Sequence, residues 1–126
     1  MEIKLGTTYD PHEHADQIGV RIEYQRLRTA NGLWLPEYRT IILQPRMRKI
    51  VERSVLAHEM GHVCLGHQES TPRNELRADR WAVRKLVAPG ALEHAALISP
   101  DPGDWCHHLG VSADLIERAL LDRNAA

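Results

Sequence analysis

Two histidines and a glutamate in the run His58-Glu59-Met60-Gly61-His62 have the types and spacing of a metal site. On a helix, side chains four residues apart share a face, roughly 5–6 Å apart at Cβ, so both imidazoles can reach one ion. This HExxH pattern is typical of zinc sites in which the intervening glutamate is the general base. The pattern predicts His58 and His62 as metal ligands and Glu59 as the catalytic base that takes a proton from bound water.

A hydrolytic zinc site has three protein ligands and one water, so a third ligand must come from elsewhere. Glu75 is the best candidate, because it lies in a second helical segment with Asp79 one turn further along the same face. Asp79 is then placed to hydrogen-bond a ligand histidine, which orients the ring and raises its basicity. The alternative is that these carboxylates belong to a solvated, charged helix surface.

His67 is a weaker candidate for the third ligand. The spacing HExxHxxxxH is one residue shorter than the HExxHxxGxxH pattern of another zinc peptidase class. His67 also falls at the expected end of the helix, beside Gly66. We therefore expect it at the rim of the active-site cleft or as a plain helix cap.

The elements around the motif predict an α+β fold, in which a short helix and a small three-stranded sheet precede the metal-site helix. Alternating or β-branched residues predict strands at 20–27, 33–35 and 38–43, with a turn signal at Asn31-Gly32. Their order along the chain predicts a meander. Capping signals and apolar periodicity predict helices at 10–18, 46–65, 72–88 and 91–98, and two short helices within 104–121.

The length of 126 residues predicts a single domain over 1–126, in which 101–126 forms a helical docking or helix-turn-helix-like extension. The turn Leu109-Gly110-Val111-Ser112 is typical of helix-turn-helix units. A DNA-reading helix is usually basic, and Asp114 and Glu117 beside Arg118 do not provide that charge. Packing or partner docking is therefore preferred to DNA binding.

The bulk composition indicates a soluble globular protein, with 43% hydrophobic and 26% charged residues and a formal net charge of −1. No apolar run is long enough for a membrane span, and no signal peptide is visible at the start. Cys64 and Cys106 are isolated, which favours reduced thiols over a disulfide. These features together predict a cytoplasmic protein. Its oligomeric state cannot be inferred from them.

From about Asp10 to Pro89 the chain resembles the ImmA/IrrE-type zinc metallopeptidases of bacteria, phages and mobile elements. The resemblance rests on Asn31-Gly32-Leu33-Trp34, on 56–67 around the HExxH, and on 75–82, where Asp79 and Trp81 replace the usual Asn and Phe. It implies zinc on His58, His62 and Glu75, with Glu59 as the base. It also implies that the substrate is a helix-turn-helix repressor of mobile-element or stress genes.

The strand 38–43 leads into the metal-site helix, so we expect it to be the sheet edge that borders the cleft, with Tyr38 and Ile41 as cleft residues. An extended segment of the substrate could then pair with this strand. The main rival function is a non-catalytic, zinc-containing regulator that acts by binding its partner. A DNA-binding module is the third hypothesis.

Overall fold

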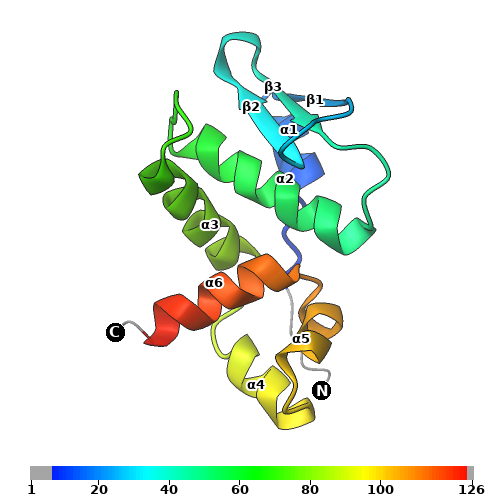
Figure 1. Cartoon of the computed structure of the whole chain (residues 1–126), viewed down its shortest axis with the longest axis vertical. Helices are drawn as coiled ribbons and strands as arrows, with labels where there is room; N and C mark the ends of the chain where they lie inside the picture. The colour runs from blue at the N-terminus through cyan, green and yellow to red at the C-terminus, as the bar shows by residue number, and fades with distance from the viewer. Residues whose placement is uncertain (1–6, 125–126) are drawn as a thin grey trace.

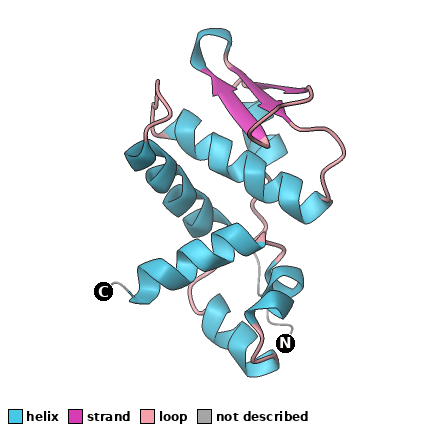
Figure 2. Ribbon diagram, in the orientation of Figure 1, coloured by secondary structure: helices cyan, strands magenta, loops and turns pink. Residues whose placement is uncertain are grey.

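The computed structural model describes residues 7–124 and has the predicted α+β architecture (Figure 1). Residues 1–6 and 125–126, which the predicted domain includes, lie outside the described range. Within that range, none of the helices combines the length and apolar character needed to cross a bilayer. Figure 2 shows the elements, which in chain order are α1 (Pro11–Gln17), β1 (Arg21–Tyr24), β2 (Gly32–Leu35), the 3-10 helix η1 (Pro36–Tyr38), β3 (Thr40–Leu43), α2 (Lys49–Cys64), α3 (Pro72–Leu86), α4 (Ala91–Ile98), α5 (Pro102–Leu109) and α6 (Ala113–Asn124).

The sheet is mixed, so the predicted meander is wrong. Its strand order is β1-β3-β2, with β3 parallel to β1 and antiparallel to β2. The cause lies at the end of β3, where the Leu43 carbonyl accepts a hydrogen bond from the backbone N–H of Gln25 at 3.1 Å. The backbone N–H of Gln44 donates to the Asn31 carbonyl at 2.8 Å, and the Gln44 amide bonds both backbone groups of Leu27. The chain therefore passes around the end of β3 and returns on its other side.

This topology overturns the expectation that residues 38–43 form a free edge beside the cleft. β3 is hydrogen-bonded on both sides, since Ile41 faces Ile22 in one register and Trp34 in the other. The Ile41 side chain is completely buried, so Ile41 is a core residue and not a cleft residue. Tyr38 lies in η1 rather than in a strand and is 70% exposed.

Helix α2 lies between the sheet and the C-terminal helices (Figure 1). Its residues belong to two apolar clusters, one shared with the sheet and one shared with the C-terminal helices. Leu56 and Met60 pack with Ile41 and Leu43 of β3, and all four side chains are fully buried. Ala57, on another side of the same helix, belongs to the second cluster. Full burial of a leucine or methionine contributes about 1.5–3 kcal/mol, so contacts on both sides fix α2 firmly.

Helices α3 to α6 follow the predicted positions closely. The Thr71 hydroxyl accepts a hydrogen bond from the backbone N–H of Asn74 at 3.1 Å, which caps α3 at its first turn. The described part of 101–126 packs on α2 and α3 through the second cluster. Two hydrogen bonds also join it to α2, from Arg53 to the Gly110 carbonyl at 2.8 Å and from the backbone N–H of Ser112 to Ser54 at 2.9 Å.

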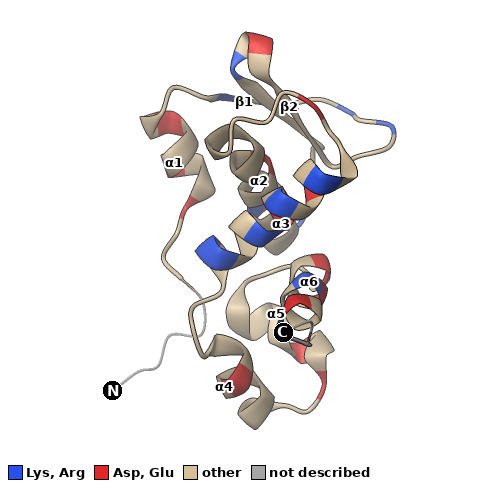
Figure 3. Cartoon of the chain, turned by 90° about the vertical axis from the view of Figure 1, so that its left-hand side faces the viewer, with Lys and Arg blue, Asp and Glu red and all other residues tan. Residues whose placement is uncertain are grey.

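Acidic and basic residues are distributed unevenly over the helices. Figure 3 shows Lys and Arg positions along α3 and acidic positions on α4 and α6. On α6, Arg118 pairs with Asp122 at 3.4 Å, and Arg123 pairs with Glu93 of α4. Both arginines of the last helix are thus engaged in ion pairs within the protein.

Candidate active site

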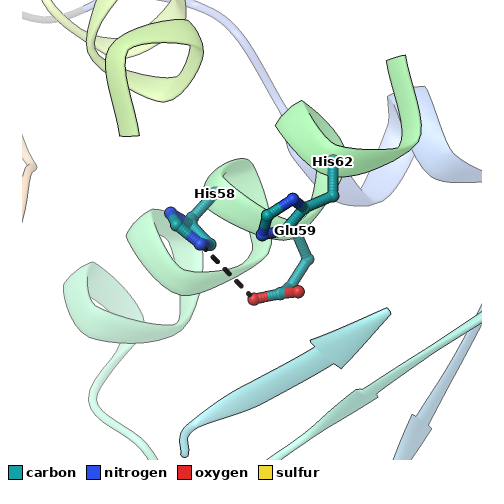
Figure 4. Close-up of side chains that lie close together, drawn as sticks. All are labelled: His58, Glu59 and His62. Atoms are coloured by element: carbon teal, nitrogen blue, oxygen red, sulfur yellow. Dashed lines mark ion pairs between the residues drawn. The ribbon is translucent and has the colours of Figure 1, made fainter. Parts of the chain in front are cut away.

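His58, Glu59 and His62 lie together on α2, and Glu59 points toward the sheet (Figure 4). Carboxylates of α3 contact the two histidines. One ligand atom from each of the three side chains lies within 4.8 Å of the other two. The His58 and His62 rings meet edge to face, with centroids 4.8 Å apart. His62 and Glu59 are buried, whereas 18% of the His58 side chain is exposed. The predicted motif therefore forms a compact cluster of metal-ligating groups.

Close packing of α3 on α2 brings two further carboxylates to this cluster. A Cβ at Gly61 would lie 2.9 Å from the carbonyl oxygen of Ala78 and 3.0 Å from its Cα, so only glycine allows this approach. Ala78 lies between Glu75 and Asp79 on α3. The glycine within the HExxH motif thus lets both carboxylates reach the histidines.

Glu75 faces the two histidines of the motif. Its Oε2 lies 3.2 Å from Nε2 of His58 and also contacts Nε2 of His62. Its second oxygen accepts a hydrogen bond from the Ser70 hydroxyl at 3.1 Å. Burial alone would raise the pKa of Glu75, but the nearby charges of His58 and His62 lower it. Both imidazole Nε2 atoms and one carboxylate oxygen therefore converge at one point.

Asp79 binds the opposite side of the His58 ring. Its Oδ1 lies 2.6 Å from His58 Nδ1, so this ring has a carboxylate at each nitrogen. Burial alone would lower the pKa of His58, but the Asp79 hydrogen bond and the charges of Glu59, Asp79 and Glu75 raise it to about 9. In the neutral ring, a proton held on Nδ1 by Asp79 leaves Nε2 free as a ligand atom.

Glu59 is held between α2 and β2, away from the point where Glu75 meets the histidines. Its Oε2 lies 4.0 Å from Nε2 of His58, farther than the Glu75 oxygen. The side chain lies against Gly32 of β2, where an added Cβ would be 3.0 Å from Glu59 Cγ and 3.1 Å from Oε2. Burial and the charge of Glu75 raise the pKa of Glu59 to about 7, against the lowering effects of His58 and the Trp34 backbone. A carboxylate with this pKa can accept and release a proton near neutral pH.

His67 is buried and touches the other histidine of the motif. Its Nδ1 lies 2.9 Å from Nδ1 of His62, the nitrogen that points away from Glu75. His67 also lines the cleft next to the cluster.

The cleft extends on both sides of the cluster. On one side it is lined by Leu33, Trp34 and Pro36 with His67 and Gln68. On the other it is lined by Asn31 and Val55 together with Ser112, Asp114 and Leu115 at the start of α6. Ala30, Gly32, Glu59 and Glu75 line both parts. Of the three residues predicted at the cleft, His67 lines it, whereas Tyr38 and Ile41 do not.

Sequence reasoning missed the contribution of β2 and of α6 to this cleft. The Asn31-Gly32 pair was interpretable only as a turn, although Gly32 supplies the space that Glu59 occupies. The first turn of α6 follows a helix-turn-helix-like signal that gives no indication of a cleft wall. No sequence signal marks Leu33 as a cleft residue, because its 43% exposure is a property of the assembled fold.

One comparison with known proteins places the chain in a family. The family model described as IrrE N-terminal-like domain, Peptidase_M78, matches residues 15–121. This range includes the HExxH cluster, Glu75 and Asp79, the whole sheet and most of α6. A comparison with curated proteins gives no match.

Proposed function

The chain belongs to the IrrE N-terminal-like family of M78 metallopeptidases, as its resemblance to ImmA/IrrE enzymes predicted, and from this we propose that it is a zinc endopeptidase acting on a protein substrate. The single observation that carries the proposal is the convergence of the two Nε2 atoms and the Glu75 oxygen beside a buried Glu59. Hydrolytic zinc sites use such a set of two imidazoles and one carboxylate.

His58, His62 and Glu75 are the proposed zinc ligands. The Glu75 oxygen is closer to His58 Nε2 than the Glu59 oxygen is, at 3.2 Å against 4.0 Å, which favours Glu75 over Glu59 as the third ligand. A zinc ion there would supply a water with its pKa lowered to about 7 and would polarise a substrate carbonyl. Asp79 orients His58 by holding a proton on its Nδ1.

Glu59 is the proposed general base. Its carboxylate takes the proton from the attacking water and passes it to the leaving amine nitrogen. In the metal-free fold, burial is the largest cause that raises the pKa of this carboxyl to about 7. β2 excludes water from one side of the carboxylate and limits its rotation, because Gly32 lies against it.

The substrate is proposed to bind in an extended form beside β2. Within residues 7–124, β2 is an outer strand of the sheet, and its residues Gly32, Leu33 and Trp34 line the cleft. An added strand would gain main-chain hydrogen bonds with little demand on sequence. Side chains on both sides of the cluster, from Trp34 to Leu115, would then select the cleaved segment.

For the identity of the substrate, we propose a cytosolic helix-turn-helix repressor of a mobile element or stress response. This proposal is supported by the resemblance to ImmA/IrrE-type enzymes. The rival is a regulator that keeps the zinc site but only binds its partner. A buried Glu59 beside the ligands favours the enzyme, since mere binding of zinc does not need a base there.

The test uses purified wild-type protein and two variants. Zinc content is measured by atomic absorption, and cleavage of unfolded carboxymethylated casein and of candidate repressors is followed by mass spectrometry. Glu59→Gln should retain zinc and lose at least about 10²-fold in rate, the usual contribution of a positioned general base. Glu75→Ala should lose zinc. Cleavage by Glu59→Gln at the wild-type rate would refute the mechanism, and zinc binding without cleavage by wild type would favour the regulator.

A further inference from the structure

The end of helix α2 places His67 directly against His62. The backbone N–H of His67 donates to the His62 carbonyl at 3.0 Å, and that of Gly66 donates to the Val63 carbonyl at 3.2 Å. Gly66 has a positive φ of 71°. These are the features of a Schellman motif, in which the residue after the glycine contacts the residue five positions before it. An apolar contact frequently accompanies this motif, whereas here two imidazole rings meet.

The contact joins Nδ1 of His62 to Nδ1 of His67. If His62 binds a metal, the hydrogen bond between these two nitrogens can have only one direction. Nε2 of His62 faces Glu75 and the proposed zinc position, so it must be unprotonated to bind a metal. The neutral His62 ring then carries its proton on Nδ1. Nδ1 of His67, 2.9 Å away, is the acceptor for that proton, and His67 carries its own proton on Nε2.

We propose that His67 is a positioning residue that accepts a hydrogen bond from Nδ1 of His62 and so holds this ring in the tautomer and orientation that bind the metal. It plays for His62 the role that Asp79 plays for His58. The proposal rests on the zinc site of the proposed function. It goes beyond that function, because it assigns His67, which is neither ligand nor base, to the support of the ligand set.

Burial makes this contact different from a surface pairing of two histidines. His67 is 8% exposed and His62 is 5% exposed, so little solvent is present to replace a lost hydrogen bond. Removal of the acceptor would leave the Nδ1–H of His62 buried without a partner, which is unfavourable. Loss of such a supporting partner usually weakens metal affinity about 10–100-fold.

A pair of variants of equal shape separates hydrogen bonding from packing. His67→Asn places an oxygen on Cγ, where the histidine has Nδ1, and can accept the hydrogen bond. His67→Leu has nearly the same shape and provides the apolar contact usual in a Schellman motif, but it has no acceptor. His107→Leu is the control, because His107 is an exposed histidine on α5 that does not line the cleft.

The measurement is the dissociation constant for zinc, obtained by competition with a chromophoric chelator, together with thermal unfolding of the zinc-free proteins. We expect His67→Leu to bind zinc about 10–100-fold more weakly than wild type. His67→Asn should recover most of this loss, and His107→Leu should match wild type. All zinc-free variants should unfold cooperatively.

Equal zinc affinities for His67→Leu and His67→Asn, whether both reduced or both unchanged, would overturn the inference and reduce His67 to a packing role. In that case wild-type zinc binding and cleavage would still support the proposed function. Failure of the wild type itself to bind zinc would instead refute the site on which both proposals depend.

Discussion

Replacement of Gly32 by alanine should impair catalysis while leaving the metal ligands in place. The added Cβ would lie 2.8 Å from Val55 Cγ1, 3.0 Å from Glu59 Cγ and 3.1 Å from Glu59 Oε2. Carbon atoms prefer separations of about 3.5–4.0 Å, so β2 or the Glu59 side chain must shift by roughly 0.5 Å or more. Overpacking of this kind typically reduces stability by about 1–3 kcal/mol.

The same shift displaces the proposed base from the attacking water. A misplacement of about 1 Å can reduce a rate about 10²-fold, so a shift of roughly half that size should reduce kcat/KM by about 10-fold or more. Zinc affinity should stay close to that of wild type, because the atoms nearest to an added Cβ belong to Val55 and Glu59 and not to the proposed ligands. The effect on catalysis should therefore appear without a loss of metal.

The assay compares kcat/KM, zinc affinity and thermal unfolding for wild type, Gly32→Ala and the control Gly103→Ala. Gly103 lies in the first turn of α5, where the atoms nearest to an added Cβ belong to the Asp101 carboxylate, at 3.3 Å or more. The control should keep wild-type activity. Wild-type kcat/KM in a folded Gly32→Ala protein would refute the role of β2 in holding Glu59, and a parallel loss of zinc would show that the change acts on the ligands instead.

Two further predictions concern Asp79 and His58. Asp79→Ala should retain some zinc but lower the zinc affinity about 10–100-fold, because His58 Nδ1 loses the Asp79 oxygen that lies 2.6 Å away. Competition with a chelator measures this affinity, and an unchanged affinity would contradict the prediction. The zinc-free protein should become less stable between pH 7.5 and pH 8.5, because the pKa of His58 is raised from 6.5 to about 9 in the fold. The stabilisation from protonated His58 is complete below about pH 6.5 and is lost as the pH rises through 9. Thermal unfolding of the zinc-free protein in chelator at the two pH values measures this loss of stability. The loss should be smaller in Asp79→Ala. Equal melting temperatures of the wild type at pH 7.5 and pH 8.5 would refute the prediction.

The helices were predictable because their signals are local. Asp10 accepts from the backbone N–H groups of His12 and Glu13 and starts α1 with Pro11 at its first position, as the sequence indicated. Helix α3 starts at Pro72 as predicted and ends at Leu86, two residues earlier than expected. The HExxH spacing also predicted the shared face of His58 and His62, since helical periodicity alone determines it.

The order of strands was not predictable by the same means. Each strand has four residues, and the apolar pattern of β3 fits a central or an edge position equally well. The central position of β3 depends on contacts between residues that are distant in the sequence. Among them are the hydrogen bonds of the Gln44 amide with the backbone of Leu27, 17 residues away. All four side chains of β3 are buried, which is the mark of its central place, but burial is a property of the assembled fold.

The contacts that support the site are encoded in steric details rather than in the periodicity of charged residues. At Gly61, helix α3 approaches α2 too closely for a side chain, and this approach brings Glu75 and Asp79 to the histidines. At Gly32, strand β2 approaches α2 in the same way and confines Glu59. Gly66 fixes a helix end that directs His67 back onto His62. The spacing between His62 and His67, four residues that include Gly66, therefore has a structural cause. The helix end at Gly66 places the His67 ring beside the His62 ring. This explains why His67 contacts His62, a proposed zinc ligand, although the spacing of His67 does not fit a third zinc ligand.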